Sequence, residues 1–199
     1  MNLSTMTLIT GWSRSGKRKM ALERARLFSR KIFLATAEAI DPEMKDRIAR
    51  HQKERGESFL TVEEPVALAK ALRENAAAAD VILIDCLTFW LNNLLHYRLD
   101  ASKEIADFLK VLEEKPTSLV LVTNEINMGV IPSDPLSRRF VEEQGRLNQE
   151  VAGRADEVIL MVSGIPQILK SNFSVSPHPS LSPKGGEGGG EGVEISPHR

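Results

Sequence analysis

Five short apolar runs, separated by longer segments, constrain the fold of this chain more than any other feature. The runs are rich in β-branched residues, and none alternates cleanly between polar and apolar positions, which is typical of strands covered on both faces of a sheet. They are MTLIT (6–10), KIFLAT (31–36), DVILID (80–85), SLVLVT (118–123) and EVILMV (157–162). We therefore expect a mostly parallel sheet.

The segments between the runs carry apolar residues at helical spacing. They cover residues 17–30, 63–79, 87–99, 102–115 and 135–155. The resulting order, β-α-β-α-β-α-α-β-α-β, predicts a doubly wound α/β fold with right-handed crossovers. A chain of 199 residues with 42% hydrophobic content has room for one such domain with a substantial core.

The composition changes near residue 173. Residues 174–199, SVSPHPSLSPKGGEGGGEGVEISPHR, are built from Ser, Pro, Gly and Glu and offer little to bury. Such a segment cannot repay the entropy of ordering. We therefore expect an α/β domain over residues 1–172 and a disordered, low-complexity tail over residues 173–199.

Charge and cysteine content limit the partners and the compartment. The chain has 26 basic and 27 acidic residues, so no field of one sign argues for nucleic acid or an anionic membrane as a partner. No apolar run approaches the roughly 20 residues of a membrane span, and MNLSTMTLIT lacks the layout of a signal peptide. The single Cys86 fits a reducing compartment, so we expect a cytoplasmic protein.

A phosphate-binding loop follows the first apolar run. Gly11, Gly16 and Lys17 match the pattern G-x-x-x-x-G-K, between an expected strand and an expected helix. In this context backbone N–H groups and the positive helix end converge on an anion, and the lysine reaches the outer phosphates. Further donors come from Ser13, Arg14 and Ser15 between the glycines.

The metal ligand of this motif is missing, because Arg18 stands where a Ser or Thr hydroxyl would hold Mg²⁺. An arginine cannot coordinate a cation, so the metal would need phosphate oxygens, water and another side chain. Asp85 ends an apolar strand, as a Walker B carboxylate does, and is our candidate for a Mg²⁺ ligand. The alternative is that Asp85 only caps the helix that follows it.

His51 lies in a densely charged segment between the second and third apolar runs. A neutral imidazole can attack the α-phosphorus of a nucleotide and form a phosphoramidate, which splits nucleotidyl transfer into two easier steps. Arg47, Arg50, Lys53 and Arg55 could neutralise the phosphates. The alternative is a solvated histidine on a charged helix.

Taken together, these motifs resemble a known family, the bifunctional adenosylcobinamide kinases and adenosylcobinamide-phosphate guanylyltransferases of cobalamin biosynthesis. The matching stretches extend over residues 7–170. They are ITGWSRSGK, EMKDRIARHQ, TVEE, LIDCLT, LVTNEINMGVIP and RRFVEEQGRLNQEVAGRADEVILMVSGIPQILK.

The resemblance implies a RecA-like P-loop NTPase fold, assembly into homotrimers, and two activities. One phosphorylates the aminopropanol hydroxyl of adenosylcobinamide with ATP or GTP. The other transfers GMP from GTP to that phosphate through a guanylylated histidine, here His51. The positions that match the family's GTP contacts are Gly11, Trp12, Ser13, Arg14, Ser15, Gly16, Lys17, Arg18, Ala35, Thr36, Ala37, Gln52, Lys53, Glu54, Arg55, Glu63 and Asp85.

The chain departs from the family pattern at four of these or neighbouring positions. Trp12 replaces the second loop glycine, Arg18 replaces a serine, Arg50 replaces the first of two adjacent histidines, and Asp85 replaces the more usual glutamate. Two alternatives therefore stay open. The chain could be another P-loop kinase or NTPase, or a GTP-binding homologue whose kinase activity is impaired.

Overall fold

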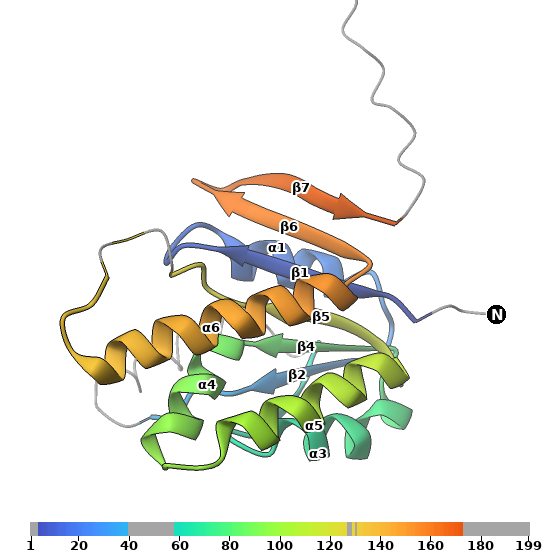
Figure 1. Ribbon diagram of the computed structural model, residues 1–199. Helices are drawn as coiled ribbons and strands as arrows, with labels where there is room; N and C mark the ends of the chain where they lie inside the picture. The colour runs from blue at the N-terminus through green and yellow to red at the C-terminus, as the bar shows by residue number, and fades with distance from the viewer. Residues whose placement is uncertain (1–3, 40–57, 127–128, 130, 173–199) are drawn as a thin grey trace, which may run out of the picture.

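A seven-stranded sheet with the strand order β3-β2-β4-β5-β1-β6-β7 forms the centre of the computed structural model, which describes residues 4–39, 58–126, 129 and 131–172 (Figure 1). The strands are β1 (Met6–Gly11), β2 (Lys31–Ala35), β3 (Leu60–Glu63), β4 (Val81–Asp85), β5 (Ser118–Val122), β6 (Glu157–Val162) and β7 (Ile165–Ser171). The helices are α1 (Lys17–Ala25), α3 (Leu68–Asn75), α4 (Leu87–His96), α5 (Ala101–Glu114) and α6 (Pro135–Arg154), with a 3-10 turn, η1 (Ala76–Ala78), after α3.

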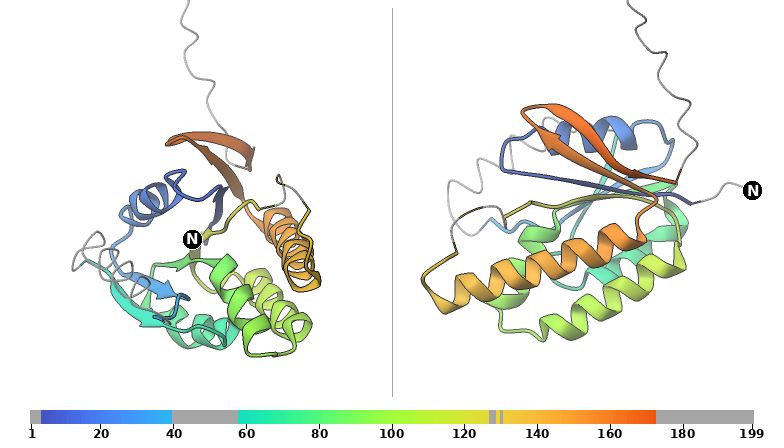
Figure 2. Two further views of the ribbon diagram at one scale, coloured as in Figure 1. Left: turned by 90° about the vertical axis from the view of Figure 1, so that its left-hand side faces the viewer. Right: turned by 45° about the horizontal axis from the view of Figure 1, so that its top comes forward.

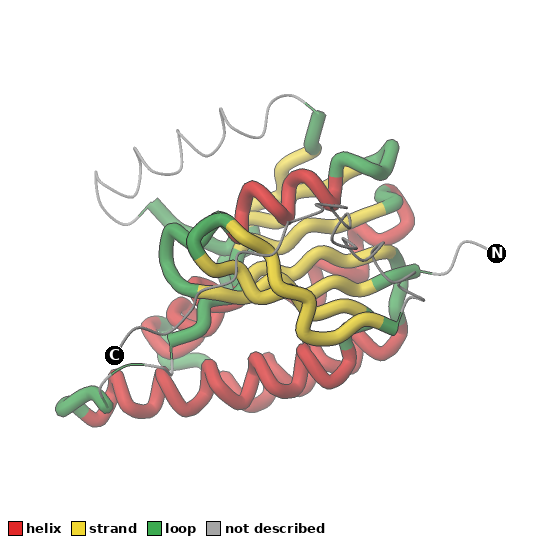
Figure 3. The backbone as a smooth tube through the Cα atoms, turned by 90° about the horizontal axis from the view of Figure 1, so that it is seen from above, coloured by secondary structure: helices red, strands yellow, loops and turns green. Residues whose placement is uncertain are grey.

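In the order of the sheet, β3, β2, β4, β5, β1 and β6 are all parallel to one another, and β7 returns antiparallel to β6. Figure 3 shows the sheet from above, with its strands side by side. The prediction of a mostly parallel sheet is thus confirmed. The two outermost strands, β3 and β7, were not predicted. Each is exposed along most of its length, so neither carries the continuous apolar run that marked the inner strands.

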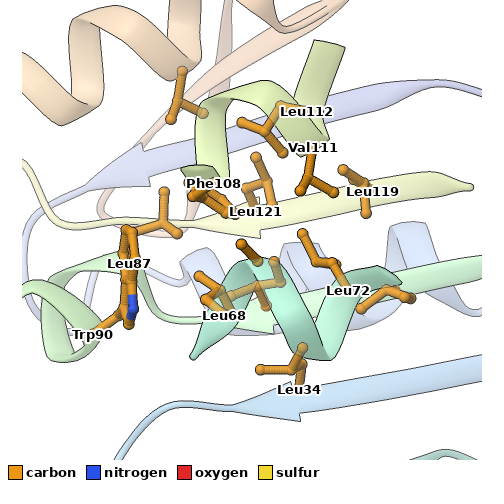
Figure 4. Packing of buried hydrophobic residues seen from close by; sticks show 14 of the residues in the cluster. Leu34, Leu68, Leu72, Leu87, Trp90, Phe108, Val111, Leu112, Leu119 and Leu121 are labelled. Atoms are coloured by element: carbon orange, nitrogen blue, oxygen red, sulfur yellow. The ribbon is translucent and has the colours of Figure 1, made fainter. Parts of the chain in front are cut away.

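Helices cover both faces of the sheet, as the doubly wound prediction requires. Figures 1 and 2 show α1 on one face and α3, α4, α5 and α6 on the other. Successive strand residues contribute to two separate cores: Leu8 packs on the side of α5 and α6, whereas Ile9 packs on the side of α1. Trp90, Phe108 and neighbouring leucines fill the larger core (Figure 4).

The order of the strands places the candidate site. β5 lies between β1, which carries the phosphate-binding loop, and β4, which ends at Asp85. Because the inner strands are parallel, the ends of β1, β2, β4 and β5 meet at one edge of the sheet, where α/β proteins bind their ligands.

Local signals explain where the two longest helices begin. Asp100 and Asp134 cap α5 and α6 by accepting hydrogen bonds from the backbone N–H groups of Lys103 and Ser137, and Pro135 stands in the first turn of α6. Within the described residues, no helix has both the length and the apolarity that crossing a bilayer requires.

Candidate functional site

The loop between β1 and α1 depends on glycine at both ends. Gly11 has a φ of 143° and Gly16 a φ of 96°, values that L side chains rarely adopt. A Cβ atom at Gly11 would stand 2.5 Å from the carbonyl oxygen of Met161 on β6, so the backbones approach too closely for a side chain. The turn between β6 and β7 also contacts the loop, because Gly164 N–H donates to the Ser15 carbonyl oxygen at 2.9 Å.

The N-terminus of α1 has features that favour an anion. Gly16 is the N-cap and supplies no side-chain acceptor, and the first turn contains no acidic residue. The backbone N–H groups of this turn therefore keep their partial positive charge. Ser15 Oγ is buried and has no hydrogen-bond partner among the described residues. These are the features of a phosphate cradle.

Lys17 lies inside the loop. Its side chain is buried, and its ammonium group donates a hydrogen bond to the Trp12 carbonyl oxygen across the loop. Burial lowers the pKa of Lys17, whereas the nearby Asp85 carboxylate acts in the opposite direction. The lysine thus points its charge to the centre of the loop, where phosphate oxygens would restore the solvation that burial removes.

Trp12 fits the loop although it replaces a glycine. Among the described non-glycine residues with positive φ, only Arg14 belongs to this loop, so Trp12 has backbone angles that any L residue adopts. Trp12 is 54% exposed, so it lies at the surface. The substitution therefore leaves the path of the loop intact.

Arg18, by contrast, turns inward and pairs with Asp85. Its Nε lies 3.4 Å from Asp85 Oδ2, and its Cζ lies 5.3 Å from the centroid of the Phe33 ring. The Arg18 and Asp85 side chains are only 19% and 17% exposed. The N-cap residue of α4 is Cys86, and no side chain caps this helix end by a hydrogen bond. Asp85 is therefore not the cap of α4.

A divalent cation held by a loop hydroxyl and Asp85 does not fit this arrangement. The hydroxyl is replaced by a guanidinium group, and that group is paired with the carboxylate. No cluster of three or more His, Cys, Asp or Glu side chains suited to a metal occurs in the part of the chain that the structure describes. Asp85 as a Mg²⁺ ligand stays a prediction, which the experiment below tests against its alternative.

The segment after β2 lies beside Asp85. Ala35 pairs with Asp85 on β4 and with Glu63 on β3 in the sheet register. Three residues predicted to contact GTP therefore lie at one edge of the sheet. Thr36 is buried: its hydroxyl donates to the Cys86 carbonyl oxygen at 2.7 Å and accepts from Cys86 N–H at 2.8 Å. The Thr36 side chain thus joins β2 to the end of β4, and Ala37 follows it, half-buried.

Cys86 is a buried free thiol. Burial raises its pKa to about 12, with the Asp85 charge acting in the same direction. The thiol is therefore protonated at neutral pH and packs as a small apolar group.

The structure thus brings together the loop from Gly11 to Arg18, the segment from Ala35 to Ala37, Glu63 and Asp85. The other predicted site residues lie outside the described residues, so their relation to the loop stays a prediction. They are His51, Gln52, Lys53, Glu54 and Arg55.

Glu125 belongs to the same edge and received no role from the sequence. Its backbone N–H donates to the Gly11 carbonyl oxygen at 3.1 Å, and its carboxylate accepts from the buried Thr10 hydroxyl at 3.4 Å. Asn124 precedes it, and its backbone N–H donates to the Thr88 hydroxyl at 2.9 Å. The signal was present, because TNE directly follows the apolar run of β5.

Comparison with known proteins decides the family. The family described as cobinamide kinase / cobinamide phosphate guanyltransferase matches residues 7–169. The chain belongs to this family. The resemblance seen in the sequence is thereby confirmed.

Three relatives match almost over their full length. The bifunctional adenosylcobalamin biosynthesis protein CobP of Pseudomonas aeruginosa is 44% identical over 168 residues, which cover 82% of this chain and 96% of that protein. The bifunctional adenosylcobalamin biosynthesis proteins CobU of Escherichia coli and Salmonella typhimurium are each 35% identical, over 83% of this chain and 99% of their own length.

Proposed function

We propose that this chain is a bifunctional enzyme of cobalamin biosynthesis. It phosphorylates adenosylcobinamide and transfers GMP from GTP to adenosylcobinamide phosphate, which yields adenosylcobinamide-GDP. The observation that carries this function is the family match over residues 7–169, which includes the loop with its uncapped helix end. A different P-loop kinase or NTPase, the first alternative, would share the loop without the match through β5 and α6.

We propose that GTP, or ATP in the kinase reaction, binds with its phosphates in the loop. The α1 N–H groups, Ser15 and Lys17 would contact the phosphates, and the strand ends at Ala35–Ala37, Glu63 and Asp85 would line the rest of the nucleotide. These groups come from the phosphate-binding loop, from the first turn of α1, and from the ends of β2, β3 and β4 or the residues directly after β2. They could therefore hold phosphates without rearrangement of the sheet.

We propose that His51 performs GMP transfer, with Gln52, Lys53, Glu54 and Arg55 as its neighbours at the nucleotide. An imidazole nitrogen attacks the α-phosphorus of GTP, a nitrogen–phosphorus bond forms, and the bond to the bridging oxygen breaks so that pyrophosphate leaves. A phosphate oxygen of adenosylcobinamide phosphate then attacks the same phosphorus. The nitrogen–phosphorus bond breaks, and the histidine is regenerated.

The test is a covalent label. Incubation with α-labelled GTP and Mg²⁺ should give an acid-labile protein adduct, and His51→Ala should abolish it while GTP binding persists. His96→Ala is the matched control, because His96 is an exposed histidine at the end of α4 and should leave labelling unchanged. Normal labelling of His51→Ala would reject the assignment.

A second candidate is a GTP-binding homologue with an impaired kinase half. The observation that favours it is the Arg18–Asp85 ion pair at the position of the motif's metal-holding hydroxyl. Separate rates for phosphorylation and GMP transfer distinguish the two candidates. We expect Arg18→Ser to raise the kinase rate more than the transferase rate, since transfer depends chiefly on His51. Equal loss of both rates would make Arg18 a phosphate clamp.

We also propose that the protein forms homotrimers in the cytoplasm. The β6–β7 hairpin supports an interface, because it exposes large apolar side chains at one edge of the sheet, three of them on the edge strand β7. They are Val162, Ile165, Ile168 and Leu169. Light scattering should give three times the chain mass, and Ile165→Lys with Ile168→Lys should lower it. A monomeric parent protein would reject the trimer.

A further inference from the structure

Arg18 and Asp85 form a charge pair at a position where the loop motif provides for a metal. Arg18 is the second residue of α1 and directly follows Lys17, so the loop presents two cationic side chains in succession. Asp85 faces them from the end of β4. The described geometry therefore already contains the positive charge that a bound ion would bring to the carboxylate.

Three elements hold the guanidinium in place. It extends from the first turn of α1, pairs with Asp85 on β4, and lies 5.3 Å from the ring centroid of Phe33 on β2. Contact with the face of an aromatic ring and with a carboxylate both favour the charged form of arginine. Since both side chains are largely shielded from solvent, separating them would leave each charge poorly compensated.

We propose that Arg18 acts as a built-in cation in place of a divalent ion held by the protein. Given the proposed function, on which this step rests, GTP binds the loop with an affinity that depends little on Mg²⁺. Asp85 then serves to orient Arg18 rather than to bind a metal. The guanidinium carries a fixed charge and phosphate-compatible donors, so it can stabilise phosphate oxygens beside Lys17.

The physical reason is competition for one carboxylate. A divalent ion that approached Asp85 would meet the positive charge of Arg18, and like charges at short range in a partly dehydrated site repel strongly. Any Mg²⁺ that arrives with GTP would then be held by phosphate oxygens and water alone. Its removal should cost the protein–nucleotide complex few contacts.

The experiment measures the Kd for GTP in Mg²⁺ and in EDTA, with Trp12 as reporter. Trp12 is half-exposed on the loop, whereas Trp90 is fully buried in the core and should give a constant signal. For the parent protein we expect the two Kd values to differ by less than about threefold. Arg18→Ser should raise that ratio to about tenfold or more, because a hydroxyl and an unpaired Asp85 can now hold the ion.

Two further variants separate this effect from a loss of net charge. Lys19→Ser removes a cation from the exposed face of the same helix turn and should keep the parent ratio. Arg18→Ser combined with Asp85→Asn should return the ratio to below about threefold, because the new ligand pair is broken.

The proposal would be overturned if the two Kd values of the parent protein differed by about tenfold or more and Asp85→Asn abolished that difference. Such a result would show that Asp85 binds the ion. An unchanged ratio in Arg18→Ser would also overturn it. Absence of GTP binding in both media would reject the nucleotide function itself. That outcome is distinguishable, since the two others require binding.

Discussion

Two neighbouring departures from the family's loop pattern have opposite structural consequences. Trp12 replaces a glycine but does not need a positive φ, and it is half-exposed on the loop, so the loop path survives. Arg18 replaces a serine, keeps the helix intact and redirects charge into the site by pairing with Asp85. The type of residue therefore matters less than the direction of its side chain, and the sequence does not reveal that direction.

Gly11→Ala should damage both stability and GTP binding. Its Cβ would lie 2.5 Å from the Met161 carbonyl oxygen at a φ of 143°, so the loop must move. We expect a loss of about 1–3 kcal/mol in the free energy of unfolding and a weaker GTP affinity. Denaturant unfolding and GTP titration measure the two effects.

The control for Gly11→Ala is Gly153→Ala in α6. No heavy atom lies within 4 Å of the Cβ that it would add, and Gly153 has no positive φ. This change should stabilise the protein by about 0.5–1 kcal/mol and leave GTP affinity unchanged. Equal behaviour of the two variants would contradict our account of the loop.

At the scale of elements, a buried polar network fixes the end of β5 against α6. Thr123 Oγ1 donates to Asn148 Oδ1 at 2.7 Å, and Gln144 Nε2 donates to both of these oxygens, at 3.0 and 2.8 Å. Asn148 Nδ2 donates to the Asn124 carbonyl oxygen at 3.1 Å. The network thereby orients the segment in which Glu125 contacts the phosphate-binding loop.

Asn148→Leu should destabilise the protein by about 1–3 kcal/mol, because buried donors and acceptors lose their partner. The same change should weaken GTP binding through the displaced Asn124–Glu125 segment. Gln149→Ala, an exposed neighbour on the same helix, should change neither. Denaturant unfolding and GTP titration provide the comparison, and a stable Asn148→Leu with normal affinity would show that the network is dispensable.

Burial decides which elements could be predicted. The five inner strands followed from apolar runs, because both of their faces are covered by helices. β3 escaped prediction since its four residues are mostly exposed, and β7 since it depends on pairing with β6. α1 ends at Ala25, five residues before the predicted end.

The phosphate-binding loop could be located from the spacing of its glycines and lysine. The Arg18–Asp85 pair and the Glu125 contacts could not be predicted, because they join segments that are distant in the sequence and meet only in the folded chain.

For the whole molecule, the boundary of the domain is a prediction. The last described strand ends at Ser171, and we propose that residues 1–172 form the functional domain. Truncation after residue 173 should leave the melting temperature and GMP transfer unchanged, because the removed Ser, Pro, Gly and Glu residues offer little apolar surface to bury. Calorimetry and the labelling assay measure both. A large fall in either would show that the tail docks on the domain.

The support that the β6–β7 hairpin gives to the loop has a consequence for protein synthesis. β1 and its loop leave the ribosome early, yet β6 pairs with β1 and Gly164 bonds Ser15 only when almost the whole domain has been translated. Thr7 and its partner Glu157 are 150 positions apart, so these contacts close the longest loops of the fold. A nascent chain halted after β5 would carry the complete motif without the backbone that shapes it. Nucleotide capture should therefore be among the last events of biogenesis, and it would distinguish finished chains from interrupted ones.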